Sequence, residues 1–188
     1  MIPKGFLFSI VEAAIKKPGR KDLALIYSKV EANIAGTFTT NRVKAAPVKL
    51  NIKKIKSGRG QAIIVNSGNA NACTGKKGIQ DAALMAKLIA DGLNIKPSLI
   101  YVCSTGVIGA PMPMERVRQK IPELIDNLGR STVEDVAAAI ITTDTFPKIV
   151  RKKVKIGNEM GIIVGICKGA GMICPDMATM LCFIMTDM

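Results

Sequence analysis

Thr179 is the residue whose surroundings most clearly favour chemistry. It follows a segment with glycines at positions 169 and 171 and a proline at position 175, and an apolar run begins at Met180. A threonine hydroxyl is a weak nucleophile without a base beside it, and one solution is the threonine's own α-amine, freed when the preceding peptide bond is cut. The pKa of such an amine is about 7.7–8.0, so it can accept and return a proton near neutral pH.

The lack of histidine excludes two common ways to activate a nucleophile. The chain contains no histidine, so neither a Ser-His nor a Cys-His pair can be built from it. A threonine that becomes N-terminal does not need one, because its own amine serves as the base. The chemistry available to this chain is therefore cleavage between Ala178 and Thr179, followed by nucleophilic attack by the new N-terminal threonine.

Five segments in order resemble signatures of one family. The segment 168–181, KGAGMICPDMATML, resembles the self-cleavage segment of the ornithine acetyltransferase family. Members of that family are the bifunctional glutamate N-acetyltransferases of the cyclic arginine pathway. The other four are GTFTTN at 36–41, NSGNANACTG at 66–75, STGVIG at 104–109 and TTDT at 142–145. They extend over nearly the whole chain, which makes chance a poor explanation.

The Thr105-Gly106 pair directly follows a predicted strand. A hydroxyl and a backbone N–H at such a place can stabilise a developing oxyanion, and preorganised donors of this kind are worth roughly 3–4 kcal/mol each. The alternative is that Gly106 serves only as a turn residue. The family resemblance implies that Thr105 and Gly106 form the oxyanion hole and that Thr179 is the nucleophile, which also contacts substrate.

Two further residues are candidates for binding substrate. Lys168 follows an apolar strand and would be costly to bury without a partner, and a substrate carboxylate would be such a partner. The resemblance agrees, and it also implies that Thr142 contacts substrate. The alternative for the 142–145 cluster is a polar helix exit, and the sequence leaves open which of Thr142, Thr143 and Thr145 points inward.

The asparagine-rich segment 66–71 follows another predicted strand. Asparagine amides and backbone N–H groups suit it to holding a carboxylate or carbonyl group. The alternative is a turn that binds nothing, since Asn and Gly are common turn residues. The resemblance favours a place near the substrate.

The reaction implied by the resemblance is transfer of the acetyl group of N-acetylornithine to glutamate. It would proceed by ping-pong kinetics through an acyl-enzyme on Thr179, with no cofactor and no metal. Whether acetyl-CoA also donates an acetyl group is left open. The resemblance also implies an alpha-chain domain at 1–178 and the start of a beta chain at 179–188, from one precursor, assembled as a heterotetramer of two alpha and two beta chains.

Two other functions remain as alternatives. One is a related self-processing aminopeptidase with the same N-terminal nucleophile. The other is an inactive fragment that acts as a basic binding module, because the formal net charge is +13. However, the basic residues are spread along the chain without interleaved aromatic residues, which favours solvated lysine-rich faces over a nucleic-acid partner.

The composition is that of a globular α/β protein. Hydrophobic residues make up 48% of the 188 residues and charged ones 22%, enough for one domain or a compact pair. No apolar run is long enough to span a membrane. The cysteine count, five, is odd, which favours reduced thiols and a cytoplasmic location.

Short apolar or β-branched runs predict strands, which alternate with amphipathic helices, and this pattern favours layered β-sheets covered by helices. The strands are expected at residues 22–28, 34–40, 62–65, 99–103, 162–166 and 180–185. The family resemblance implies a sandwich in which the alpha and beta chains are interleaved.

Three helices are predicted between the strands. The first covers residues 78–91 and should stop at Gly92. The second lies within 113–128, where Pro122 is expected to kink or interrupt it. The third should begin at Ser131, because Ser131 and Glu134 match a capping box.

Overall fold

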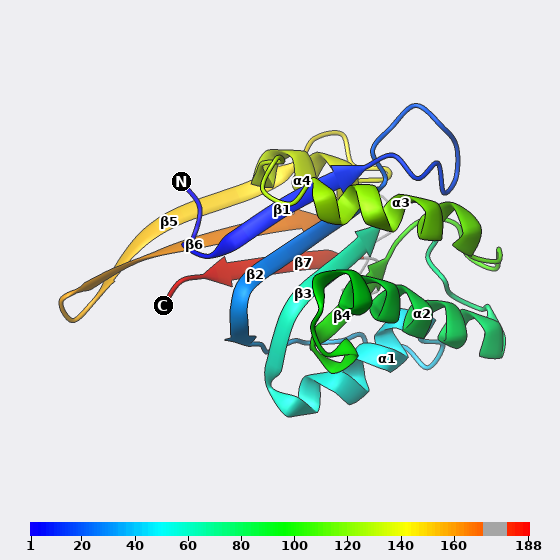
Figure 1. Cartoon of the computed structure of the whole chain (residues 1–188), viewed down its shortest axis with the longest axis horizontal. Coiled ribbons are helices and arrows are strands. Elements are labelled where there is room, and N and C mark those ends of the chain that lie inside the picture. The colour runs from blue at the N-terminus through cyan, green and yellow to red at the C-terminus, as the bar shows by residue number, and fades with distance from the viewer. Residues whose placement is uncertain (171–179) are drawn as a thin grey trace.

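The computed structural model describes residues 1–170 and 180–188. Its strands and α-helices, in chain order, are β1 (Phe6–Val11), β2 (Leu23–Asn33), α1 (Ala46–Lys54), β3 (Arg59–Asn66), α2 (Gly75–Leu93), β4 (Ile100–Ser104), α3 (Met114–Asp126), α4 (Val133–Ile140), β5 (Lys148–Ile156), β6 (Glu159–Lys168) and β7 (Leu181–Thr186). Short 3-10 turns stand at Ile55–Ser57 and Pro97–Leu99. The expected α/β fold with layered sheets is confirmed (Figure 1).

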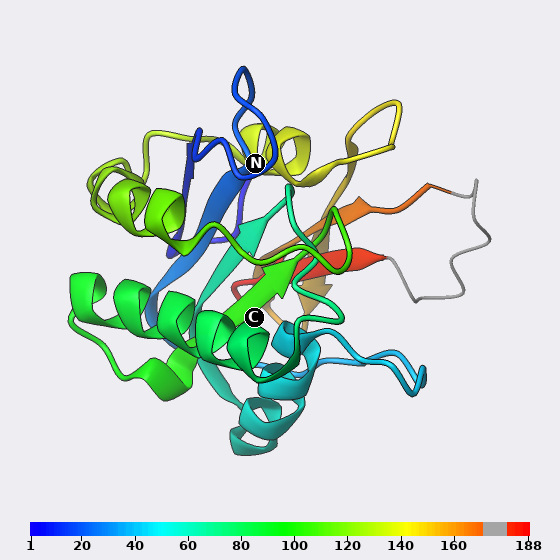
Figure 2. The ribbon, with the colours of Figure 1, turned by 90° about the vertical axis from the view of Figure 1, so that its right-hand side faces the viewer.

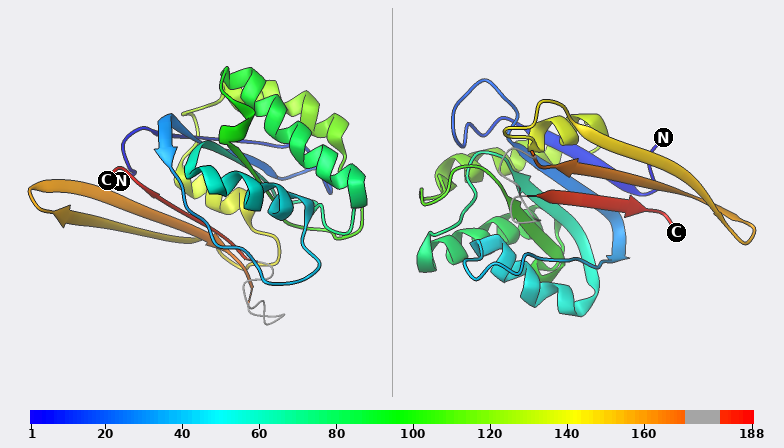
Figure 3. Two further views of the ribbon diagram at one scale, coloured as in Figure 1. Left: turned by 90° about the horizontal axis from the view of Figure 1, so that it is seen from below. Right: turned by 180° about the vertical axis from the view of Figure 1, so that it is seen from behind.

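The strands form two sheets. The first has the order β1-β2-β3-β4, with antiparallel pairs except for β3 and β4, which are parallel. The second is the antiparallel meander β5-β6-β7. The β5–β6 hairpin extends beyond the body of the molecule (Figure 1), while β7 and the inner part of β6 lie against the first sheet (Figure 3).

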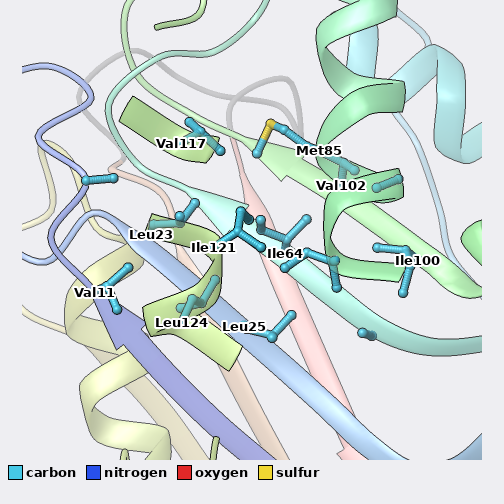
Figure 4. Packing of buried hydrophobic residues seen from close by; sticks show 14 of the residues in the cluster. Val11, Leu23, Leu25, Ile64, Met85, Ile100, Val102, Val117, Ile121 and Leu124 are labelled. Carbon is cyan, nitrogen blue, oxygen red and sulfur yellow. The ribbon is translucent and has the colours of Figure 1, made fainter. Parts of the chain in front are cut away.

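Two hydrophobic cores cover the two faces of the first sheet. One lies between that sheet and helices α2 and α3, and Figure 4 shows Ile64 and Met85 meeting there. The other lies between the opposite face, helix α4 and the second sheet, with Phe8, Val136 and Ile166 all nearly inaccessible to solvent. The first sheet is therefore the central layer, and its strand ends are held rigidly from both sides.

The expected strands at 62–65, 99–103, 162–166 and 180–185 are confirmed within one to three residues at each end. The expected strand at 34–40 is wrong, because this segment has no regular structure. Its neighbour β2 ends at Asn33, which pairs with Arg59, the first residue of β3. Beyond that point, β3 offers segment 34–40 no residue to pair with.

Helix α2 ends later than expected, and Pro122 does not interrupt helix α3. Helix α2 continues through Gly92 and ends at Leu93, with Asn94 in the left-handed conformation as its cap. Gly92 instead allows close packing on α3, since a Cβ there would lie 2.2 Å from Cδ1 of Ile125. Helix α3 runs through Pro122, which is exposed, so the carbonyl group that it leaves without a donor can bind water.

The capping box of α4 is one residue later than expected. Thr132 is the N-cap, with reciprocal hydrogen bonds to Asp135, and the expected pair of Ser131 and Glu134 is wrong. Ser131 is instead bridged to Phe8 of β1, where its amide donates to the Phe8 carbonyl. The tertiary contact therefore fixes which of the two hydroxyl residues caps the helix.

Candidate active site

Two signature segments meet where β3 and β4 end. Because these strands are parallel, the segments that follow them, 67–71 and 105–109, leave the sheet at the same edge. The amide of Thr105 donates to the Asn66 carbonyl at 3.0 Å, and the amide of Ala70 donates to the Val107 carbonyl at 2.8 Å. The two segments thus run side by side as a rigid extension of the sheet.

Gly106 lies at the closest approach of these segments. Its φ is +132°, and a Cβ there would lie 2.4 Å from the carbonyl carbon of Gly68. Only glycine fits such a position without moving the backbone. Gly106 is exposed, and its amide makes no hydrogen bond with any residue in 1–170 or 180–188. Within these described residues, the Gly106 N–H is thus left for another acceptor.

The asparagine side chains of segment 66–71 donate hydrogen bonds to groups of the chain itself. The side-chain amide of Asn66 donates to the Ser104 hydroxyl at 2.7 Å, and that of Asn69 donates to the carbonyls of Ala110 and Pro111 at 3.0 and 3.1 Å. The amide of Asn71 donates to the Gly78 carbonyl at 2.8 Å.

All three asparagines are buried, with exposed fractions of 0–4%. Their side-chain amides are therefore engaged within the chain, and they hold the loop's shape. They fix the shape of the loop, and the expectation that this segment lies near the substrate stays a prediction.

Lys168 connects the second sheet to the end of β4, where Thr105 lies. It is the last residue of β6 and only 4% exposed, although it carries an ammonium group. Its Nζ donates to the Thr105 hydroxyl oxygen at 3.2 Å. Burial lowers the pKa of Lys168, while the nearby charge of Asp144 acts in the opposite direction. Two of the predicted site residues, 63 positions apart, are thus in direct contact.

Asp144 organises the 142–145 segment, and the sequence reasoning did not single it out. Its side chain is completely shielded from solvent. It accepts hydrogen bonds from Lys148 Nζ at 2.7 Å, from the Gly169 amide at 2.7 Å and from the Thr142 amide at 3.4 Å. Burial alone would raise the pKa of this carboxyl, but the hydrogen bonds, first that of Lys148, outweigh burial and lower the pKa to about 2.

The hydrogen bonds of Asp144 also determine the position of Thr142. It is half-buried, whereas Thr143 and Thr145 are exposed, and its side chain makes no hydrogen bond with the described part of the chain. Because Asp144 bonds both the Thr142 and Gly169 amides, the 142–145 segment is tied to the residue that follows Lys168. Thr142, Lys168 and Thr105 therefore come from three segments that gather at one end of the molecule.

Arg20 is a second positioning residue that the sequence reasoning missed. Its guanidinium donates to the carbonyls of Ala139 and Ile141 at 3.2 and 2.7 Å, and to the Ser67 hydroxyl at 3.2 Å. It thus fastens the C-terminal end of α4, which leads into segment 142–145, to the asparagine-rich loop. No local sequence signal marks Arg20, because its partners are 47 to 121 positions away.

A cavity of about 720 Å³ opens between the two sheets beside these residues. Its walls are mainly apolar, and they include Thr105 from the first sheet's edge and Met180 and Leu181 before and at the start of β7. The predicted nucleophile Thr179 and the cleavage-site residue Ala178 lie outside the described residues. Met180, the first described residue after the gap, lines the same cavity as Thr105.

Residues 1–170 and 180–188 contain no group of three or more His, Cys, Asp or Glu side chains placed to hold a metal ion. In the same part of the chain, every helix is too short or too polar to cross a membrane. The strand ends present two hydrogen-bond donors, the Thr105 hydroxyl and the Gly106 N–H, and the Lys168 ammonium group contacts that hydroxyl.

The fold is similar to that of two solved structures. The crystal structure of the arginine biosynthesis bifunctional protein ArgJ from Bacillus halodurans has a TM-score of 0.85 and 37% sequence identity, and the match covers 90% of this chain and 89% of that chain. The ornithine acetyltransferase from Mycobacterium tuberculosis, solved in complex with ornithine, has a TM-score of 0.80 and 35% identity, covering 90% and 91%.

Sequence comparison identifies the family. The model of the ArgJ family matches residues 7–188, so the chain belongs to the ArgJ family. The arginine biosynthesis bifunctional protein ArgJ of Geobacter sulfurreducens is 55% identical over 98% of this chain and 47% of its own length. A mitochondrial protein of that name from Lodderomyces elongisporus is 45% identical over 98% and 44%. The chain spans about half the length of the curated relatives it matches.

Proposed function

We propose that this chain is the alpha-chain portion of a self-processing acetyltransferase that moves the acetyl group of N-acetylornithine to glutamate. The contact of Lys168 with Thr105 is the observation that carries this proposal, and beside it the Gly106 amide has no hydrogen-bond partner within residues 1–170 and 180–188. The similarity to an ornithine acetyltransferase bound to ornithine supports the substrate class.

The first step is cleavage of the chain. The Thr179 hydroxyl attacks the carbonyl of Ala178, the peptide bond becomes an ester, and water hydrolyses the ester. The division falls between an alpha chain at 1–178 and a beta chain that begins at Thr179. The α-amine of Thr179, once free, has a pKa close to neutral and serves as the general base for its own hydroxyl.

Acetyl transfer then proceeds through a covalent intermediate. The Thr179 hydroxyl attacks the acetyl carbonyl of N-acetylornithine, and the oxyanion accepts hydrogen bonds from the Gly106 N–H and the Thr105 hydroxyl. Collapse of the tetrahedral intermediate expels ornithine and leaves the acetyl-enzyme. The glutamate amine then attacks the ester and carries the acetyl group away, which gives ping-pong kinetics.

Lys168 has two roles in this proposal. Its Nζ donates to the Thr105 oxygen, so the hydroxyl proton is left to point at the oxyanion, and the positive charge makes that hydroxyl a stronger donor. An ammonium has three protons, and we assign a further one to the substrate carboxylate. Thr142, half-buried on the neighbouring segment, contacts the same substrate.

The test compares Thr105→Val with Thr105→Ser in the complete protein. Valine keeps the shape of threonine without its hydroxyl group, whereas serine keeps the hydroxyl. Loss of one oxyanion donor lowers kcat by about 10²–10³. We expect that loss for valine and a much smaller one for serine, measured as acetyl transfer from N-acetylornithine to glutamate. Equal activity of the two variants would refute the role of Thr105.

The same assay separates the alternative functions. An acetyltransferase passes the acetyl group to glutamate, whereas a self-processing aminopeptidase releases an amino acid to water. The names of the relatives, arginine biosynthesis bifunctional protein and ornithine acetyltransferase, favour transfer. Assembly as a heterotetramer of two alpha and two beta chains is part of the proposal and is measured by the mass of the purified complex.

A further inference from the structure

Two cysteines face each other across the second sheet. Cys167 in β6 and Cys182 in β7 are direct partners in the antiparallel register, next to the pair of Lys168 and Leu181. Strands β6 and β7 lie side by side, as Figure 2 shows in orange and red. Both cysteines are free thiols. Their side chains project from the same face of the sheet, because direct partners share a face.

That face is the one turned away from the core. Cys182 is exposed and Cys167 is half-buried. In the register position two residues further along, Gly165 pairs with Ile184, which is 71% exposed. The residues on either side of the cysteines, Ile166 and Phe183, point into the core instead. On this face of the described chain, the cysteine pair is therefore open to solvent.

The pairing also satisfies the geometry of a disulfide. Direct partners in an antiparallel pair have Cα atoms about 4.5–5.5 Å apart, and disulfides span about 4.4–6.8 Å between Cα atoms. Closure therefore needs rotation of side chains and no movement of the strands. The Cys167 thiol now donates to the Lys168 carbonyl at 3.8 Å, a weak interaction that closure would replace.

The two thiols differ in their surroundings. Burial raises the pKa of Cys167, and the neighbouring Cys182 raises it further, so Cys167 stays protonated near neutral pH. Susceptibility to oxidants follows exposure as well as thiolate character. The exposed Cys182 is therefore the thiol that an oxidant reaches first, with Cys167 placed to react second.

We propose that Cys167 and Cys182 form a redox-responsive pair that closes to a disulfide when a peroxide oxidises it. The Cys182 sulfur attacks one peroxide oxygen, the O–O bond breaks, and water leaves, so that Cys182 carries a sulfenic acid. The Cys167 sulfur then attacks the Cys182 sulfur, the S–O bond breaks, and a second water leaves with the Cys167 proton. Two thiols and one hydrogen peroxide thus give one disulfide and two waters, and the peroxide takes the two electrons.

The position of the pair gives the disulfide a further consequence, which rests on the proposed self-cleavage. The bond between Ala178 and Thr179 lies between the two cysteines in the sequence, so a disulfide would join the alpha and beta chains covalently after cleavage. It would also fasten β6 to β7 beside Lys168, which contacts Thr105. The pair therefore lies where oxidation would change how firmly the two chains hold the site.

The experiment uses the complete protein, oxidised with hydrogen peroxide, then alkylated and mapped by peptide mass. We expect loss of both thiols, a mass lower by about 2 Da, and a linked peptide that contains Cys167 and Cys182. Treatment with a dithiol reductant should restore both thiols. Because Cys174 lies in the same tryptic peptide as Cys182 in an uncut chain, its own variant is needed to assign the link.

The matched variants are single serine substitutions. Cys182→Ser and Cys167→Ser should abolish the linked peptide, whereas Cys174→Ser and Cys73→Ser should retain it, the latter removing an exposed thiol elsewhere. If Cys167 and Cys182 alkylate equally before and after peroxide in the unsubstituted protein, the proposal is wrong. A linked peptide that persists in Cys182→Ser would overturn it as well.

Gels separate this proposal from the proposed self-cleavage. If both hold, the oxidised protein gives two pieces with reductant and one without it. If the chain is not cut, the gel with reductant shows one piece, yet the peptide map still reports the disulfide. If the chain is cut but no disulfide forms, both gels show two pieces, and the redox proposal fails alone.

Discussion

Replacement of Gly106 by alanine tests whether the contact between the two signature segments is as tight as the structure indicates. At φ +132° a residue with a Cβ costs of order 1–3 kcal/mol. The new Cβ would also lie 2.4 Å from the Gly68 carbonyl carbon, so one segment must move, which adds about 1–3 kcal/mol. We expect Gly106→Ala to lower the free energy of unfolding by roughly 2–6 kcal/mol.

Gly109→Ala is the matched control, three residues along the same segment. Its φ is +81°, but a Cβ there would have no atom within 4 Å, so only the backbone cost of roughly 1–2 kcal/mol applies. Urea denaturation of both variants in the complete protein gives the comparison. Gly106→Ala should also lose acetyl transfer, because its amide is displaced. Equal destabilisation by the two substitutions would show that Gly68 and Gly106 are not in contact.

Three further predictions test other parts of the structure. The low pKa of Asp144, about 2 against 3.8, means that its stabilising effect is present above pH 3.8 and is lost as the pH falls through 2. Asp144→Asn should therefore reduce the change in melting temperature over that window. Thr132→Ala should cost about 1 kcal/mol in urea denaturation and Ser131→Ala less, because only Thr132 caps α4. Ile64→Ala should cost about 2–5 kcal/mol, whereas Val150→Ala, at an exposed position, should change stability by less than about 0.5 kcal/mol.

The sequence was most informative where periodicity and burial coincide. The apolar runs at 62–65 and 162–166 are strands because their residues fill the cores on the faces of the first sheet. Segment 34–40 has the composition of a strand and is not one, because the neighbouring strand β3 begins opposite Asn33. Local composition cannot show where a distant partner strand ends.

The same limit applies to the site. Thr105 and Lys168 could be chosen from their local motifs, but their mutual contact depends on how the second sheet packs on the first. Asp144 gave no signal beyond an acidic residue in a polar cluster, and its partners Lys148 and Gly169 come from both sides of the β5–β6 hairpin. The buried network that fixes a site is a property of the tertiary structure.

The central claim is that Thr179 becomes an N-terminal nucleophile, and intact mass spectrometry of the complete protein tests it most directly. We predict two species, the second of which begins at Thr179, and a single uncut species for Thr179→Ala. A single uncut mass for the unsubstituted, folded protein would contradict the account, because without cleavage Thr179 has no free amine to act as its base.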